Sequence, residues 1–193
     1  MPRVLNTTLE TIPGRTPYLA ADPAAVAAWR QRLALRPGML NVGLAWRGSP
    51  LHRDDAKRSL PLAAFRPLWD VPNIRIVSLQ KGPARQEIAP SCLPLLDLGE
   101  ELTDFADSAA LLMNLDLLIS VDTAAVHLAG ALHRPVWNLI TYHPDWRWGL
   151  VRTDSPWYSA MRLYRQSRRN HWTDVIEAVA GDLREFGPPR KQG

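Results

Sequence analysis

Cysteine is almost absent from this chain: Cys92 is the single one among 193 residues. One thiol can form neither an intramolecular disulfide nor a cysteine-rich zinc site. Proteins without disulfides are typical of reducing compartments, so the sequence predicts a cytoplasmic location.

Long apolar runs are absent as well. No stretch of about 18 apolar residues occurs, and the sequence therefore predicts no membrane-spanning helix. The first residues, MPRVLNTTLETIPGR, lack the apolar centre of a signal peptide, so export is not expected. Asp54 and Asp55 are adjacent acids with no third ligand in view, and we expect no metal site.

The residues that are present suit a globular domain with an anionic ligand. Hydrophobic residues make up 46% of the chain, enough for the core of one domain, and the net charge is +4. Part of the positive charge falls late, at Arg162, Arg165, Arg168, Arg169, Arg190 and Lys191. A solvated edge and tail explain this cluster, and a nucleic-acid-binding surface is the alternative. We expect no nucleic-acid partner.

Short apolar segments alternate with helix-like segments from residue 41 onward. The strand-like segments are 42–46, 74–79, 95–98, 117–121, 136–140 and, as a sixth candidate, 162–164. The helix-like segments between and after them are 61–69, 83–88, 104–114, 123–132 and 172–186. For 104–114 the pattern predicts Thr103 as the cap, with Phe105, Ala109 and Leu112 on one face.

This alternation predicts an α/β fold: a Rossmann-like parallel sheet of five to six strands with helices on both faces. The predicted domain covers residues 41–186. Residues 1–40 read as a lead-in with one helix that begins at the cap Asp22 and Pro23, and residues 187–193 read as a disordered tail. A parallel sheet places its ligand beyond the carboxyl ends of the strands.

The segment LLISVDTAAVHLAGALHRPVW, residues 117–137, carries the strongest local pattern. A strand runs directly into a helix whose first residues, Thr123, Ala124 and Ala125, are small enough to let a diphosphate reach the backbone N–H groups. Asp122 could cap this helix and also accept a hydrogen bond from a sugar hydroxyl. A purely structural cap explains Asp122 equally well, and a packed, hydrogen-bonded histidine is the preferred interpretation of His127.

Three further polar loops follow predicted strands and would meet at the same edge. The first, residues 45–61, offers Trp46, Lys57 and Arg58; the others offer Gln80 and Lys81 (78–83) and Asp145 and Trp146 (141–148). Basic groups there could neutralise phosphates, and aromatic rings could stack on a base or sugar. Each loop alone also has an ordinary structural explanation: an exposed charged loop at 45–61, a turn at 78–83 and packed aromatic side chains at 141–148.

The run SVDTAAVHLAGALHRPVW resembles the Asp-Ser/Thr-Gly/Ala-x-x-His-x-Ala-x-Ala-Leu pattern of heptosyltransferase-like enzymes, glycosyltransferase family nine. The wider set TTLETIP, KRSLPL, SLQKGP, DLGEELTDFADSAALL, DWRWGL and DSPWY is similar to the C-terminal module of bacterial tetratricopeptide-repeat proteins of this type. The resemblance covers about residues 6–166.

The resemblance implies the C-terminal, donor-binding half of a GT-B fold. It implies that Asp122, Thr123, Ala124 and Ala125 hold the diphosphate and sugar, and that Lys57 meets the leaving diphosphate. Inverting transfer without a metal and without a cofactor follows, with a nucleotide-diphosphate sugar as substrate. An N-terminal Rossmann half or a repeat domain would be the missing partner.

Two features depart from the family pattern: Ala124 replaces the usual glycine, and the acceptor half with its general base is missing from this sequence. A non-catalytic module that binds a nucleotide sugar or a protein is therefore the alternative to an enzyme domain.

Overall fold

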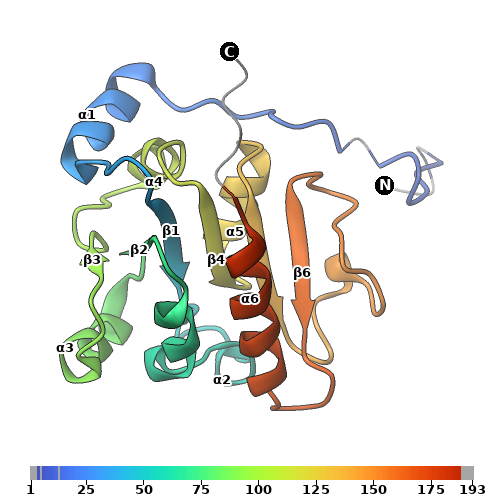
Figure 1. The fold of residues 1–193 in the computed structure, drawn as a ribbon. Helices are drawn as coiled ribbons and strands as arrows, with labels where there is room; N and C mark the ends of the chain where they lie inside the picture. The colour runs from blue at the N-terminus through green and yellow to red at the C-terminus, as the bar shows by residue number, and fades with distance from the viewer. Residues whose placement is uncertain (1–3, 5, 13, 188–193) are drawn as a thin grey trace.

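The computed structural model describes residues 4, 6–12 and 14–187. Six parallel strands form one sheet in the order β3-β2-β1-β4-β5-β6 (Figure 1). Their bounds are β1 Leu40–Ala45, β2 Ile74–Ser78, β3 Leu96–Asp97, β4 Leu117–Val121, β5 Val136–Ile140 and β6 Met161–Arg165. This confirms the predicted α/β class and all six predicted strands.

Helices cover both faces of the sheet because its strands are apolar on both sides. One face packs against α1 (Pro23–Leu33), α4 (Phe105–Leu112) and α5 (Ala124–Ala131), and the opposite face packs against the 3₁₀ helix η1 (Leu62–Asp70), α3 (Ile88–Ser91) and α6 (Thr173–Glu185). In Figure 1, α6 crosses the front of the sheet while α1 and α4 lie near its amino-terminal edge. Three short elements lie in the loops that follow the strands: α2 (Asp55–Arg58), η2 (Gly82–Glu87) and η3 (Trp146–Trp148).

Strands β1 and β4 lie side by side at the centre of the sheet, paired from Val42 with Leu117 to Ala45 with Ser120. The chain runs outward from β1 to β2 and β3, and then returns to place β4 on the other side of β1. The loops after β1 and β4 therefore diverge to opposite faces of the sheet. Ligands of open α/β sheets bind in the crevice that this divergence leaves.

The segment before β1 lies along the body of the domain. Asp22 caps α1 by accepting a hydrogen bond from the N–H of Ala25 at 2.8 Å, as predicted. Upstream, the N–H groups of Tyr18 and Leu19 donate to the carbonyl oxygen of Ala131 at 3.0 and 3.3 Å. This lead-in is thus attached to the end of α5.

The start of α4 corrects two predictions. Asp104, and not Thr103, is the N-cap: its carboxylate accepts from the N–H of Asp107 at 2.9 Å. Thr103 instead donates its own N–H to the Asp107 carboxylate at 2.9 Å. Phe105 does not join the buried face, because its position in the first turn leaves it 65% exposed.

Two remaining points concern the ends of the chain and the membrane. Residues 188–193, most of the predicted disordered tail, lie outside the described residues. Within the part of the chain that is described, no helix is both long and apolar enough to cross a membrane.

Candidate functional site

A cavity of about 890 Å³ opens at the carboxyl ends of β1, β2 and β4. All four loops singled out in the sequence contribute to its lining, the fourth through Arg147 alone. The lining carries four cationic side chains, Arg47, Arg58, Lys81 and Arg147, beside the carboxylates of Asp55, Glu87 and Asp122. The convergence predicted for these loops is thus observed.

Helix α5 begins at the wall of this cavity. Thr123 is its N-cap residue, and the next residue, Ala124, is exposed, so the first turn presents its backbone to the cavity. The Thr123 hydroxyl lies 3.1 Å from the Ser120 hydroxyl. The unpaired N–H groups and the partial positive charge of a helix start favour an anion there.

Asp122 is not the helix cap, although it lines the cavity. One oxygen, Oδ2, accepts a hydrogen bond from the indole N–H of Trp148 at 2.9 Å. The other, Oδ1, lies 3.9 Å from Nε2 of His127. The residue one position before a cap cannot be told from the cap by sequence, because the backbone angles at Thr123 make the assignment.

His127 lies one turn into α5, between two aromatic rings. It stacks on Trp148, with ring centroids 5.2 Å apart and planes 23° apart, and its Nδ1 lies 3.0 Å from the hydroxyl of Tyr158. Burial lowers the pKa of His127, and the nearby carboxylate of Asp122 opposes this only in part. The imidazole is therefore neutral at pH 7 and can offer one N–H and one acceptor nitrogen.

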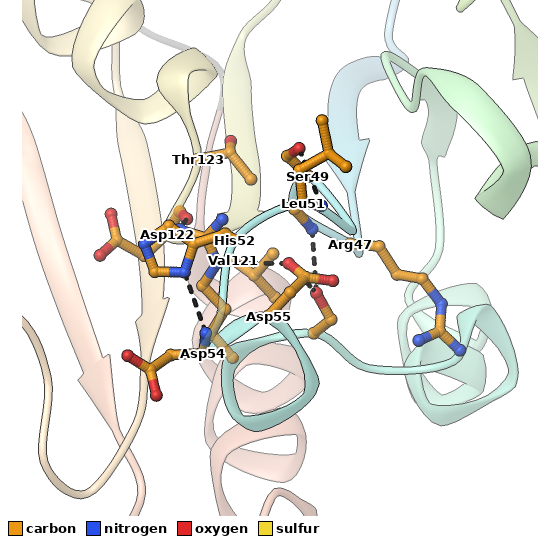
Figure 2. Close-up of polar contacts among 12 residues, drawn as sticks. Arg47, Ser49, Leu51, His52, Asp54, Asp55, Val121, Asp122 and Thr123 are labelled. Atoms are coloured by element: carbon orange, nitrogen blue, oxygen red, sulfur yellow. Dashed lines mark hydrogen bonds and ion pairs between the residues drawn. The ribbon is translucent and has the colours of Figure 1, made fainter.

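The loop after β1 folds back over the start of α5. Arg58 donates to the backbone carbonyl oxygen of Asp122 at 2.9 Å and pairs with Asp55 at 3.3 Å. Ser59 donates its hydroxyl to the same Asp55 carboxylate at 2.9 Å and accepts from the N–H of Gly48 at 2.9 Å. Figure 2 shows this loop, with Asp55 on α2 and Asp122 at the end of β4.

Gln80 braces two loops from a buried position. Its side-chain carbonyl accepts from the N–H groups of Trp46 at 2.9 Å and Arg47 at 2.8 Å, and its amide N–H group donates to the carbonyl oxygens of Arg47 at 3.2 Å and Lys81 at 3.0 Å. All of these bonds go to backbone atoms, so Gln80 shapes the cavity wall. The ammonium group of Lys81 is bonded to the carbonyl oxygen of Leu102.

This chain resembles known proteins in sequence and in fold. The model of glycosyltransferase family 9 (heptosyltransferase) matches residues 81–175, which contain the Asp122 loop, α5 and the loop with Trp148. The matched segment is 95 residues long, just under half of the chain. Among the described residues, no cluster of three or more His, Cys, Asp or Glu side chains could hold a metal ion.

A relative of this chain is a longer protein. Protein FlbA of Caulobacter vibrioides is 32% identical over 192 residues, which cover 94% of this chain and 31% of FlbA. The chain thus spans less than a third of this curated relative.

Two solved structures share the fold. One is a family 9 glycosyl transferase from Veillonella parvula, with a TM-score of 0.55 and 14% identity over 88% of this chain and 46% of that one. The other is the ADP-heptose lipopolysaccharide heptosyltransferase II of Escherichia coli, with a TM-score of 0.60 and 18% identity over 91% and 55%.

The structure brings most of the predicted site residues to the cavity. Eight of the twelve line it: Arg58, Gln80, Lys81, Asp122, Thr123, Ala124, Ala125 and His127. The other four do not. Trp46 is fully buried in the core on the α6 face, and Trp146 is 74% exposed with its ring against Trp157.

The remaining two are Lys57 and Asp145. Lys57 is 71% exposed and its ammonium group pairs with Asp54 at 2.6 Å, outside the lining. Asp145 caps η3, where its carboxylate accepts from the N–H of Arg147 at 3.0 Å. Both stand in the correct loops but face away from the cavity.

Sequence reasoning missed Arg47, His52, Asp55 and Arg147, which all line the cavity. Each lies within a loop that the sequence singled out, but these four side chains were not named. Which side chain of a charged loop turns inward depends on the bonds of that loop. Here Arg47 pairs with Glu87 and Arg58 pairs with Asp55.

Proposed function

We propose that this cavity binds a nucleotide-diphosphate sugar and that the domain is the donor-binding half of a glycosyltransferase. One observation carries the proposal: a helix start built of small residues lines the same cavity as four cationic side chains, at the crossover of a parallel sheet. The volume of about 890 Å³ lies in the range of small-molecule sites.

The diphosphate would lie on the N–H groups of Thr123, Ala124 and Ala125. Arg58 is the cation that the protein holds beside the helix start, because its guanidinium donates to the carbonyl oxygen of Asp122. Its guanidinium suits the planar recognition of phosphate oxygens. Asp122 would accept a hydrogen bond from a hydroxyl of the sugar, and the neutral imidazole of His127 would bond the same part of the ligand.

Transfer would proceed with inversion. The acceptor oxygen would attack the anomeric carbon while the bond from that carbon to the diphosphate oxygen breaks, and the electron pair would leave with the diphosphate. The helix start and Arg58 would stabilise the leaving charge. This role requires no metal ion, and Lys57 is the second cation that the family resemblance assigns to it.

The described domain would supply one half of such an enzyme, and the acceptor and the general base would come from the other half. The chain covers 46% of the Veillonella parvula structure and 55% of the Escherichia coli structure. We therefore expect this chain alone to bind the donor and to transfer sugar at no appreciable rate. An N-terminal half or a tetratricopeptide-repeat region elsewhere in the protein, and a cytoplasmic location, belong to the same proposal.

Calorimetric titration with UDP-, GDP-, ADP- and CMP-sugars tests the proposal. ADP-sugars come first, because one of the solved structures that share the fold is an ADP-heptose heptosyltransferase. Binding of a nucleotide-diphosphate sugar, lost in an Arg58→Ala variant that melts at a similar temperature, supports it. Absence of binding across the whole panel, or affinity that Arg58→Ala leaves unchanged, contradicts it.

A further inference from the structure

Trp148 is a buried residue that contacts two residues of the candidate site. It is fully buried, yet it stands in the three-residue turn η3, within a loop that otherwise exposes Trp146 and Leu150. Its indole N–H donates to Oδ2 of Asp122 at 2.9 Å, and its ring stacks on His127. One side chain thus contacts both Asp122 and His127, which line the cavity.

The turn that carries Trp148 is fixed from outside the site. Arg165, at the end of β6, donates to the carbonyl oxygen of Trp148 at 3.0 Å. The indole N–H of Trp157 donates to the carbonyl oxygen of Arg147 at 3.0 Å. The N–H of Trp148 itself donates to the carbonyl oxygen of Asp145 at 3.0 Å. These bonds hold the indole ring of Trp148 in the position from which its N–H donates to the Asp122 carboxylate.

The hydrogen bond to Trp148 makes the two carboxylate oxygens of Asp122 different from each other. Oδ2 is engaged by the indole, whereas Oδ1 lies 3.9 Å from Nε2 of His127. That separation is too long for a direct hydrogen bond. It leaves both Oδ1 and Nε2 available to one ligand hydroxyl placed between them.

We propose that Trp148 is a positioning residue for donor binding: it fixes the carboxylate of Asp122 and the ring of His127 so that the pair recognises a hydroxyl of the transferred sugar. This inference rests on the proposed function. It assigns a specific part of the ligand, the sugar and not the nucleotide, to the Trp148 contacts. Without the indole bond, the Asp122 carboxylate would lose conformational freedom when the ligand binds. Fixing it beforehand removes that entropic cost of binding.

Trp148→Phe is the variant that separates this role from packing, because phenylalanine keeps a stacked ring and removes the N–H. We expect the dissociation constant of the nucleotide sugar to rise about tenfold, as for a lost hydrogen bond to a charged group, and that of the matching nucleoside diphosphate to change less than about twofold. In an Asp122→Ala background the same change should have no further effect. Trp69→Phe is the matched control: it also removes an indole hydrogen bond, to the carbonyl oxygen of Pro94 at 2.8 Å, away from the cavity.

A ligand-free measurement keeps the test independent of the proposed function. Besides Trp148, the groups that face His127 are Asp122, Asp145, Arg147 and Tyr158. Without the indole bond the Asp122 carboxylate can turn toward Nε2, so Trp148→Phe should raise the pKa of His127 in an NMR titration. The rise should be absent when Asp122 is replaced by Asn.

The outcomes separate the two claims. If the wild-type chain binds no nucleotide sugar, the proposed function fails and the His127 titration alone decides the role of Trp148. An unchanged His127 pKa in Trp148→Phe overturns the positioning role. An equal loss of affinity for nucleotide and nucleotide sugar, or no loss, overturns it as well.

Discussion

Arg58 and Asp122 are 64 positions apart in the chain, and the guanidinium of Arg58 donates to the backbone carbonyl oxygen of Asp122 at 2.9 Å. This bond joins the loop after β1 to the loop after β4, across the place where the sheet order reverses. It places a cation directly beside the start of α5. An anion bound at that helix start would therefore meet Arg58 first.

Arg58 and Lys57 are adjacent and form a natural pair for comparison. Arg58→Ala should weaken binding of a nucleotide diphosphate about tenfold, because a charge-assisted contact within the cavity is lost. Lys57→Ala should weaken it less than about threefold, since this side chain is exposed and its interactions are screened by water and salt. Calorimetry on both variants decides between them. Equal losses of affinity in the two variants would indicate that Lys57 contacts the leaving diphosphate, as the family resemblance implies.

The small residues at the start of α5 keep the backbone accessible. Ala124→Leu should reduce affinity for a nucleotide diphosphate more than tenfold, because the added side chain covers the first N–H groups of the helix. The melting temperature should change little, since Ala124 is exposed. Ala178→Leu, on the exposed side of α6, is the control and should leave affinity intact. Undiminished binding by Ala124→Leu would place the diphosphate elsewhere.

Burial of His127 should make the stability of the domain depend on pH. The folded state holds the pKa of His127 below 6.5, so the unfolded chain binds the proton more readily. Stability from this group is therefore complete above about pH 6.5 and falls as the pH decreases from there toward the lower folded-state pKa. Urea denaturation at several pH values should show this slope, and His127→Gln should flatten it. An unaltered slope in His127→Gln, with exposed His143→Gln as the reference, would refute the assignment.

Tyr158 reaches His127 because residue 130 of α5 is glycine. A Cβ atom at Gly130 would lie 2.4 Å from Cγ of Tyr158. Gly130→Ala should therefore destabilise the domain by about 1–3 kcal/mol, as overpacking does. Gly181→Ala, in α6, meets no described atom within 4 Å of its new Cβ and should stabilise by about 0.5–1 kcal/mol. Chemical denaturation of both variants measures the difference; similar values for the two would contradict the packing described here.

The sequence predicted the sheet well because its strands are short apolar runs bounded by polar residues. The predicted segments 117–121 and 136–140 coincide with β4 and β5, and the weakly patterned 162–164 lies within β6. The helix ends were less predictable. Asp122 and Thr123 can both cap a helix, and only the backbone angles reveal that Thr123 does so.

The site was predictable as a set of loops and only in part as a set of side chains. Trp46 comes directly after an apolar strand, so the sequence places it in the loop. In the structure it packs into the core, whereas its neighbour Arg47 reaches the cavity. Trp148 belonged to a segment read as a surface for stacking. Its role emerged from a hydrogen bond to Asp122, 26 positions away, which no local pattern encodes.

A crystal structure of the chain with a nucleotide-diphosphate sugar tests the central claim most directly. We predict diphosphate oxygens within about 3 Å of the N–H groups at Thr123, Ala124 and Ala125, with Arg58 beside them and the sugar against Asp122. A nucleotide bound away from the start of α5, or a helix start that holds no part of the ligand, would contradict it.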